Sequence, residues 1–319
     1  MRMIIAGGTG LIGTKLALHW LSQGCAVSII GRSKKHIYEI YQNRVEAIEW
    51  GALEAKNLRG AAIVVNLAGA GIADKRWTKF RKEEILSSRI KPTQKIVSLL
   101  SSLGASSPPL FNASAIGVYG LQLQLKSGLP PKLDDNTLID WNHSPDFLSQ
   151  VAREWEKATH PATQESVRVV NLRFGVVLSK EGGALPKIAF PFHYFLGGSI
   201  GSGQQPFSWV SIKDVIRAID FLLENKTISG PINIVAPHCI TQNELTETLG
   251  KVLHRPTILR VPSISLKLIL GEMANELLLE GQHVYPSQLL QQGFQFSYPD
   301  IESALMDAFR KVDIKCNFP

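Results

Sequence analysis

The chain lacks the features of a secreted, metal-binding or membrane-spanning protein. Its three cysteines, Cys25, Cys239 and Cys316, lie far apart and form no Cys-x-x-Cys pair, so neither a disulfide framework nor a zinc site is expected. The eight histidines also lack metal-ligand spacing, and we expect no metal. The longest apolar runs are strand-sized, which predicts no transmembrane helix. The short apolar start, residues 3–6, is too brief for a signal-peptide core and predicts a cytoplasmic protein.

Acidic residues are outnumbered, with 27 Asp and Glu against 34 Lys and Arg, a net charge of +7. A basic chain can bind nucleic acid, but here the positive residues are dispersed. The densest run, KRWTKFRK at residues 75–82, alternates with bulky side chains and is followed by two glutamates, which is typical of a solvated helix face. We therefore expect neither nucleic acid nor membrane as a partner. A small anionic ligand fits the charge better.

Strand-like apolar runs alternate with amphipathic stretches, which predicts a parallel sheet with helices on both faces. Strands are expected at residues 2–6, 25–30, 45–50, 61–69, 109–115, 167–173 and 230–236. Helices are expected at 11–23, 77–102 (as one helix or two), 147–159, 211–224 and from 241 to about 253. Two helix starts have capping-box patterns, Ser211 with Asp214 and Thr241 with Glu244. Beyond residue 262 the alternation ends, which indicates a small helical lobe.

Three glycines, Gly7, Gly10 and Gly13, lie between the first expected strand and the first expected helix. This is the context that a dinucleotide fingerprint requires. Gly7 would permit a tight turn, Gly10 would let the backbone approach a pyrophosphate, and Gly13 would let helix and strand pack closely. The N–H groups and the dipole at the helix start attract phosphate. The spacing therefore predicts a dinucleotide-binding turn.

The end of the second strand indicates which dinucleotide binds. An acid at this point would bind the ribose hydroxyls of NAD, whereas an arginine would meet the 2′-phosphate of NADP. The chain has Gly31-Arg32-Ser33-Lys34-Lys35, with three cations and no acid. Because an arginine can hold a phosphate through two charge-assisted hydrogen bonds, we predict NADP(H) as the cofactor.

Seven stretches along nearly the whole chain carry a family resemblance. They are GGTGLIG, NLAGAGIADKRWT, RKEEILSSRI, SAIGVYG, EGGALPK, GSGQQPFSWVSIKD and LLLEGQHVYPSQLLQQGFQFSYPDIESAL. The chain resembles the atypical short-chain dehydrogenase/reductases known as NAD-dependent epimerase/dehydratase family proteins, some of which are labelled cell division inhibitors. The resemblance implies an α/β fold, a doubly wound Rossmann-type sheet with a smaller, mainly helical substrate lobe. The Rossmann domain would comprise residues 1–173 and 206–236, and the lobe residues 174–205 and 237–319.

The resemblance also implies a cofactor cleft at the carboxyl ends of the strands. The residues it assigns are Gly7, Gly10, Leu11, Ile12 and Gly13 at the pyrophosphate, Arg32 and Ser33 at the adenosine phosphate, Leu67, Ala68 and Gly69 at the ribose and diphosphate, Ala113 and Ser114 at the level of the nicotinamide, and Phe174 and Gly175 by its carboxamide. An open parallel sheet binds ligands at this edge.

The catalytic centre departs from the family pattern. The family has a Tyr-x-x-x-Lys pair on the helix after the fifth strand, with the tyrosine as acid/base and the lysine lowering its pKa. Alignment of DFLSQVAREWE places Leu148 and Ala152 at these positions, and neither can move a proton. Ser114 and Tyr119 are the remaining catalytic candidates.

The substrate side departs as well. Phe207 stands where nucleotide-sugar enzymes have an arginine for the substrate diphosphate. Lys187, in the first turn after a Gly-Gly pair, and Trp209 are candidate substrate-binding residues. We predict an NADP(H)-dependent oxidoreductase or epimerase that acts, as a monomer or homodimer, on a small non-nucleotide substrate, sugar-like or anionic. The alternative is a cofactor-binding sensor or scaffold without catalysis.

Overall fold

A parallel sheet of seven strands forms the centre of the larger lobe in the computed structural model, which describes residues 1–125 and 128–310. The strand order is β12-β6-β5-β4-β1-β2-β3, with all neighbours parallel. The bounds are β1 Arg2–Ala6, β2 Ala26–Gly31, β3 Glu46–Glu49, β4 Ile63–Asn66, β5 Leu110–Ala115, β6 Val169–Phe174 and β12 Gly230–Ile234. Each strand falls on a run that the sequence predicts, so the Rossmann-type fold is confirmed.

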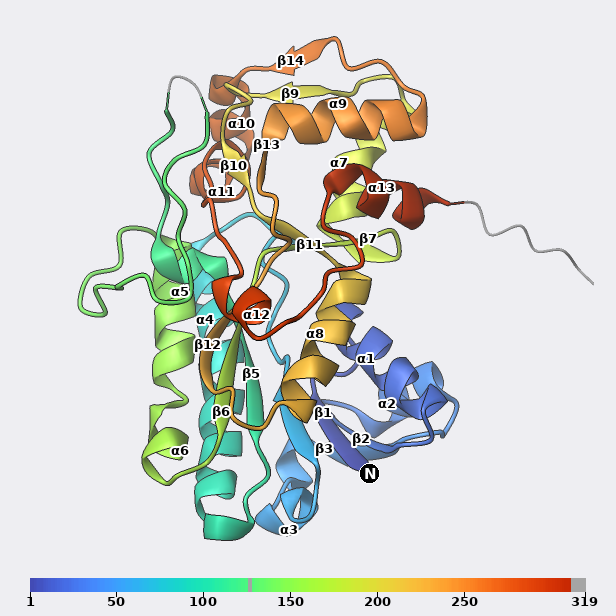
Figure 1. The fold of residues 1–319 in the computed structure, drawn as a ribbon, viewed down its shortest axis with the longest axis vertical. Helices are drawn as coiled ribbons and strands as arrows, with labels where there is room; N and C mark the ends of the chain where they lie inside the picture. Colours follow the sequence, from blue (N-terminus) through green and yellow to red (C-terminus); the bar gives the residue numbers. More distant parts are fainter. Residues whose placement is uncertain (126–127, 311–319) are drawn as a thin grey trace, which may run out of the picture.

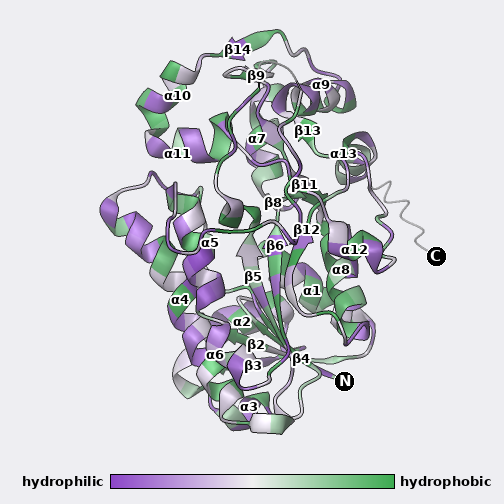
Figure 2. Cartoon of the chain, turned by 60° about the vertical axis from the view of Figure 1, so that its left-hand side comes forward, coloured by the Kyte–Doolittle hydropathy of each residue, from purple (hydrophilic) through white to green (hydrophobic). Residues whose placement is uncertain are grey.

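Helices cover both faces of this sheet (Figure 1). They are α1 Leu11–Ser22, α2 Lys34–Tyr41, α3 Ala55–Leu58, α4 Lys79–Ser101, α5 Phe147–Lys157, α6 His160–Gln164 and α8 Ile212–Glu224. Trp20 of α1 and Ile219 of α8 share one core with Ile5 of β1. Ile96 of α4 packs in a second core with Ile4, on the other face. Figure 2 shows the strands between them coloured mainly as hydrophobic, as expected for a sheet buried on both sides.

The smaller lobe contains short strands that the sequence does not predict. They are β7 Val176–Ser179, β8 Gly182–Gly183, β9 Gly198–Ile200, β10 Pro206–Phe207, β11 Trp209–Ser211, β13 Ile240–Thr241 and β14 Leu259–Val261. The helices are α7 Ala184–His193, α9 Gln242–Leu253, α10 Ser263–Leu270, α11 Glu272–Ala274, the π-helical turn η4 Asn275–Leu279, α12 Ser287–Gln291 and α13 Ile301–Phe309. β11 pairs with β7, so residues 206–236 contribute strands both to this lobe and to the large sheet.

The helix starts and breaks meet the predictions in part. Residues 79–101 form one helix with Pro92 inside it. The capping box of Thr241 and Glu244 is present. Of the capping box predicted for Ser211 and Asp214, only the first part is present: the Ser211 side chain caps α8, but Asp214 does not return a hydrogen bond to Ser211. Asp214, however, is buried and accepts the backbone N–H groups of Ser297 and Tyr298. It therefore anchors the C-terminal segment, a contact 83 residues away in the chain that local sequence cannot indicate.

No helix in residues 1–125 and 128–310 is long and apolar enough to cross a membrane. In the same residues no group of three or more His, Cys, Asp or Glu side chains is placed to hold a metal ion. Cys25 and Cys239 are free thiols. Cys316 lies outside the described residues.

Candidate functional site

The glycine turn has the geometry that its sequence predicts. Gly7 has a φ of +76°, and a Cβ at this position would lie 2.6 Å from the Leu67 carbonyl oxygen. A Cβ at Gly13 would lie 2.6 Å from the Gly7 carbonyl oxygen, whereas one at Gly10 would meet only that oxygen, at 3.5 Å. Gly10 is the N-cap of α1 and offers no side chain to the helix N–H groups. The turn therefore leaves an open backbone surface to which a phosphate can bind.

A buried tyrosine that the sequence analysis did not single out supports this turn. Tyr41, on α2, donates its hydroxyl hydrogen to the Gly8 carbonyl oxygen at 2.5 Å, and Thr14 donates to the same oxygen at 3.1 Å. These two hydrogen bonds fix the orientation of the Gly8 carbonyl group. Because Tyr41 lies 33 residues from Gly8, only the fold brings the two together.

A cavity of about 350 Å³ lies between the glycine turn and the smaller lobe. Its lining residues are Gly7, Gly10, Leu11, Ile12, Gly13 and Leu67 on one side, and Val176, Val177, Gly183 and Ala184 on the other. The Gly-Gly start of α7 thus faces the glycine turn. Lys187 does not line this cavity, because its ammonium group is exposed and lies 3.1 Å from the Ala73 carbonyl oxygen. The structure therefore places the helix start at the cleft and Lys187 outside it.

The two residues after β2 differ in their surroundings. Arg32 is exposed to solvent. Ser33 is the N-cap of α2 and accepts the backbone N–H of His36 at 3.3 Å. Ser33 therefore has a local structural role in addition to its predicted contact with the adenosine phosphate.

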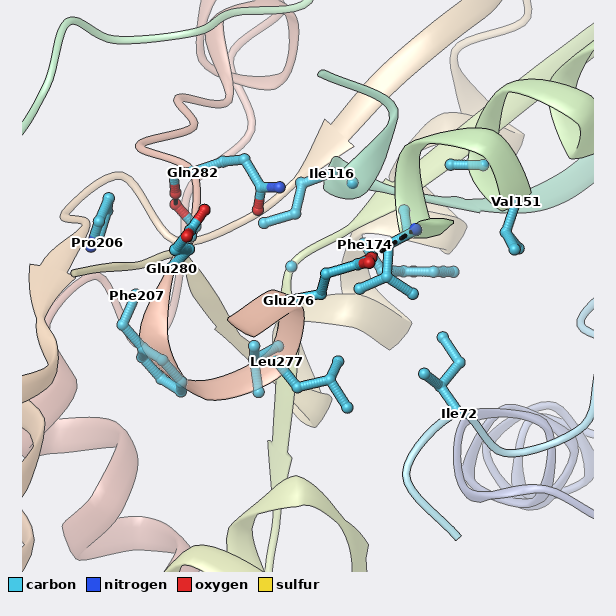
Figure 3. A pocket seen from close by; sticks show the side chains of 18 of the residues that line it. Ile72, Ile116, Val151, Phe174, Pro206, Phe207, Glu276, Leu277, Glu280 and Gln282 are labelled. Atoms are coloured by element: carbon cyan, nitrogen blue, oxygen red, sulfur yellow. Dashed lines mark hydrogen bonds between the residues drawn. The ribbon is translucent and has the colours of Figure 1, made fainter. Parts of the chain in front are cut away.

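A second cavity, of about 190 Å³, lies at the carboxyl ends of β5 and β6, and Val176 lines both cavities. Residues of five segments meet in it (Figure 3). They are Ala115, Ile116 and Gly117 at the end of β5, Leu148, Val151, Ala152 and Trp155 of α5, Phe174 and Gly175 at the end of β6, Pro206, Phe207 and Ser208 at β10, and Glu276, Leu277, Glu280, Gly281 and Gln282 of the C-terminal segment, with Ile72 and Arg89 completing the wall. Most of these side chains are apolar.

The two predicted catalytic residues lie in a buried polar network and line neither cavity. Ser114 donates to the Glu156 carboxylate at 2.6 Å. Arg173 binds the same carboxylate and donates to the Tyr119 hydroxyl oxygen at 3.0 Å. Burial raises the pKa of Tyr119 to about 12, so its phenol stays protonated near neutral pH. Their catalytic role remains a prediction.

One substrate-binding assignment needs correction. Trp209 is fully buried in the core of the smaller lobe, and its ring N–H donates to the His238 carbonyl oxygen at 3.2 Å. It therefore does not face the cavity, whereas the neighbouring Phe207 does. Phe207 and Trp209 lie in different strands, since β10 pairs with β13 and β11 pairs with β7, and only this pairing places one side chain at the cavity and the other in the core.

A carboxyl group that sequence analysis missed lies at the cavity wall. Glu276, on η4, accepts the backbone N–H groups of Phe147 at 3.2 Å and Leu148 at 2.8 Å, and Figure 3 shows it reaching toward the start of α5. Burial raises its pKa to about 7, although the two N–H groups oppose this shift. The sequence signal was an acid within the apolar run ELLLEG, which is ambiguous without the fold.

A second missed residue is Arg89 of α4, which is buried and lines the same cavity. Its Nη1 donates to the Ile85 carbonyl oxygen at 2.8 Å, and its guanidinium lies 5.1 Å from the centre of the Trp155 ring. A Cβ on Gly69 would lie 3.1 Å from the Arg89 Cζ. Gly69, predicted at the ribose, thus also makes room for this guanidinium.

The chain is similar to known proteins along nearly its whole length. The family described as "NAD dependent epimerase/dehydratase family" matches residues 3–235, and a "Domain of unknown function (DUF1731)" matches residues 261–308. An epimerase family protein of Staphylococcus aureus strain MRSA252 is 37% identical over 311 residues, covering 97% of this chain and 99% of that protein.

Two solved structures are also similar. The human epimerase family protein SDR39U1 (isoform 2), solved with NADPH, is 30% identical, with a TM-score of 0.84 and coverage of 97% of this chain and 99% of that one. A nucleoside-diphosphate sugar epimerase of Corynebacterium glutamicum is 28% identical, with a TM-score of 0.74, and the match covers 96% of this chain but 57% of that one.

Proposed function

Because the chain belongs to the NAD dependent epimerase/dehydratase family, we propose that it binds NADP(H) in the cleft and catalyses an oxidation–reduction or epimerisation of a small non-nucleotide substrate. One observation carries the proposal: the cavity at the glycine turn and the cavity walled by α5 and the C-terminal segment are neighbours that share the lining residue Val176. A dinucleotide and a small molecule could thus lie end to end. The NADPH in the human relative's structure supports the choice of cofactor.

The residues at the turn fit a dinucleotide. The open position at Gly10 leaves space that a Cβ would occupy, and the first N–H groups of α1 have no side-chain cap, so both suit a pyrophosphate. Arg32 is exposed at the end of β2 and free to reach a 2′-phosphate. When bound, the nicotinamide would supply or accept the hydride.

The chain's own contribution to the chemistry would be a proton held by Glu276. Leu148 and Ala152 line the same wall and cannot exchange protons, whereas the Glu276 carboxyl has a pKa near 7 because of its burial. A carboxyl with such a pKa can both give and take a proton at neutral pH. The apolar side chains around it would exclude water from the reacting groups.

The experiment is a single-turnover assay that follows NADPH absorbance with a panel of small aldehydes and ketones. Glu276→Gln should bind NADPH normally but react about 10²–10⁴-fold more slowly, the usual range for the loss of acid–base assistance. Glu272→Gln is the matched control, because it removes a nearby exposed carboxylate that is not part of the cavity lining. Equal rates in wild type and Glu276→Gln would reject the proposed role of Glu276.

The second candidate function is a cofactor-binding sensor without catalysis. The observation that favours it is the apolar character of the α5 wall at Leu148, Val151 and Ala152. Tight NADPH binding without oxidation by any compound of the panel would support the sensor. Absence of NADPH binding would reject both candidates.

A further inference from the structure

Arg89 is a buried cation without a counter-charge. Its residue exposure is 7%, and within residues 1–125 and 128–310 no carboxylate forms an ion pair with it. Burial lowers its pKa to about 10, and the nearby positive charge of Arg81 contributes to this shift. An unpaired buried charge is costly in a folded protein. The buried charge of Arg89 therefore indicates that an anion from outside the chain binds the guanidinium.

The free donors of Arg89 lie on one edge of the guanidinium. Nη1 is occupied by the Ile85 carbonyl oxygen. Nε is buried and has no acceptor in the part of the chain that the structure describes, and no acceptor there binds Nη2 either. Because Nε is closed to solvent, Nη2 is the donor that a carboxylate or a phosphate in the cavity can meet.

The position of Arg89 indicates which ligand would provide the anion. Arg89 lies beside Gly69, which the family resemblance assigns to the cofactor ribose and diphosphate. It nevertheless lines the cavity beside α5 and not the one at the glycine turn, where the fold presents N–H groups to a pyrophosphate. The two acids at the same cavity, Glu276 and Glu280, form no ion pair with it. At about 190 Å³ the cavity is smaller than the roughly 300–1,000 Å³ of a typical pocket for a drug-sized ligand.

We infer that Arg89 binds the anionic group of the substrate, so that the substrate is a small carbonyl or hydroxyl compound that carries a carboxylate or a phosphate. The inference deepens the proposed function and rests on it for the role of the cavity. Neutral compounds of the same size would leave the guanidinium unpaired and would bind more weakly.

The test uses oxalate and inorganic phosphate as probes, against chloride at equal ionic strength. The melting temperature of the full-length chain is measured with and without saturating NADPH, and oxalate affinity is measured by calorimetry. We expect oxalate or phosphate to raise the melting temperature of wild type more than chloride does. Arg89→Met should lose nearly all of this shift and bind oxalate about 10- to 100-fold more weakly.

Arg81→Met is the matched control. Arg81 lies on the same helix with a side-chain exposure of 8%, but it is already paired with Glu84 at 2.6 Å. Its removal should lower the melting temperature and leave the oxalate response intact. Arg89→Lys keeps the charge without the planar fork, so it should retain part of the response. If circular dichroism shows that Arg89→Met does not fold, the oxalate response of Arg89→Lys is compared with that of wild type instead, and an undiminished response would reject the role of Arg89.

Three results would overturn the inference: no oxalate or phosphate response in wild type, a response that persists in Arg89→Met, or a loss of NADPH affinity in Arg89→Met with an unchanged oxalate response. The last would assign the guanidinium to the cofactor. A wild type that fails to bind NADPH would reject the proposed function instead. The oxalate comparison without NADPH would still decide whether Arg89 is an anion site.

Discussion

Arg173 and Glu156 form an ion pair with two parallel contacts in the protein interior. Nε lies 2.8 Å from Oε1 and Nη2 lies 2.9 Å from Oε2, and the two side chains are 2% and 3% exposed. Ser114 donates to the same carboxylate, and Tyr119 accepts from the same guanidinium. The pair therefore joins β5, β6 and α5, the elements that also carry Ala115, Phe174 and Leu148 to the cavity.

Breaking this pair should strongly destabilise the fold. Arg173→Met would leave the Glu156 charge buried without its partner, at an expected cost of ~3–5 kcal/mol in the free energy of unfolding. Lys157→Met removes one partner of the solvent-accessible pair between Lys157 and Glu154 of α5, and it should lower the free energy of unfolding by only about 0.3–0.5 kcal/mol. Denaturant unfolding compares the two variants. If Arg173→Met lowers the free energy of unfolding no more than Lys157→Met does, the buried pair does not have this structural role.

Gly10→Ala should block the cofactor without disturbing the fold. The added Cβ meets only the Gly7 carbonyl oxygen at 3.5 Å, an ordinary contact, but it occupies the surface that a phosphate would approach. We expect NADPH affinity to fall by about tenfold or more, which is ~1.4 kcal/mol, with only the small fall in melting temperature that a poorer N-cap residue causes. Gly51→Ala, where nothing lies within 4 Å, is the control. Unaltered NADPH binding by Gly10→Ala would place the cofactor elsewhere.

Arg32→Ala should weaken NADPH more than NADH. Loss of a charge-assisted contact with the 2′-phosphate should cost ~1.5–3 kcal/mol, whereas NADH has no such phosphate. Calorimetric titration with both cofactors measures the difference. Arg260→Ala, an exposed arginine on β14, should change neither affinity. Equal affinity of wild type for the two cofactors would contradict the NADP(H) assignment.

Glu276 should make stability depend on pH. Burial raises its pKa from 4.5 to about 7, so the folded state holds the proton more tightly than the unfolded chain does. Its stabilising effect is full below about pH 4.5 and is lost as the pH rises through about 7. As the pH rises from about 5 to about 8, the melting temperature of wild type should therefore fall relative to that of Glu276→Gln. Glu272→Gln should show a pH dependence close to that of wild type. A constant difference between wild type and Glu276→Gln over this range would show that Glu276 titrates as an ordinary exposed acid.

The sequence was sufficient wherever the signal was local. A strand followed by three spaced glycines and a helix indicates a dinucleotide turn, since the reason for each glycine lies within a few residues of it. The apolar runs likewise located all seven strands of the large sheet. Residue types alone also showed that Leu148 and Ala152 cannot exchange protons, and the structure then placed both at the cavity.

The site was less predictable because it is assembled from distant segments. Glu276 lies 128 residues from Leu148, whose N–H it accepts, so no pattern within one helix could reveal it. Arg89 resembles a solvated helix cation until the fold places it beside Gly69 and Trp155. Trp209 was predicted at the substrate because it belongs to the same short segment as Phe207, residues 207–209.

The sequence by itself therefore determined the α/β fold, the glycine turn and the basic end of β2. These depend on hydrophobic periodicity and on backbone freedom, which neighbouring residues determine. Only the tertiary structure decided which polar side chains reach the cavity. Burial and pairing are properties of the whole packed chain: the same packing that leaves Arg89 without a partner and raises the pKa of Glu276 also joins Ser114 and Tyr119 to the Arg173–Glu156 pair.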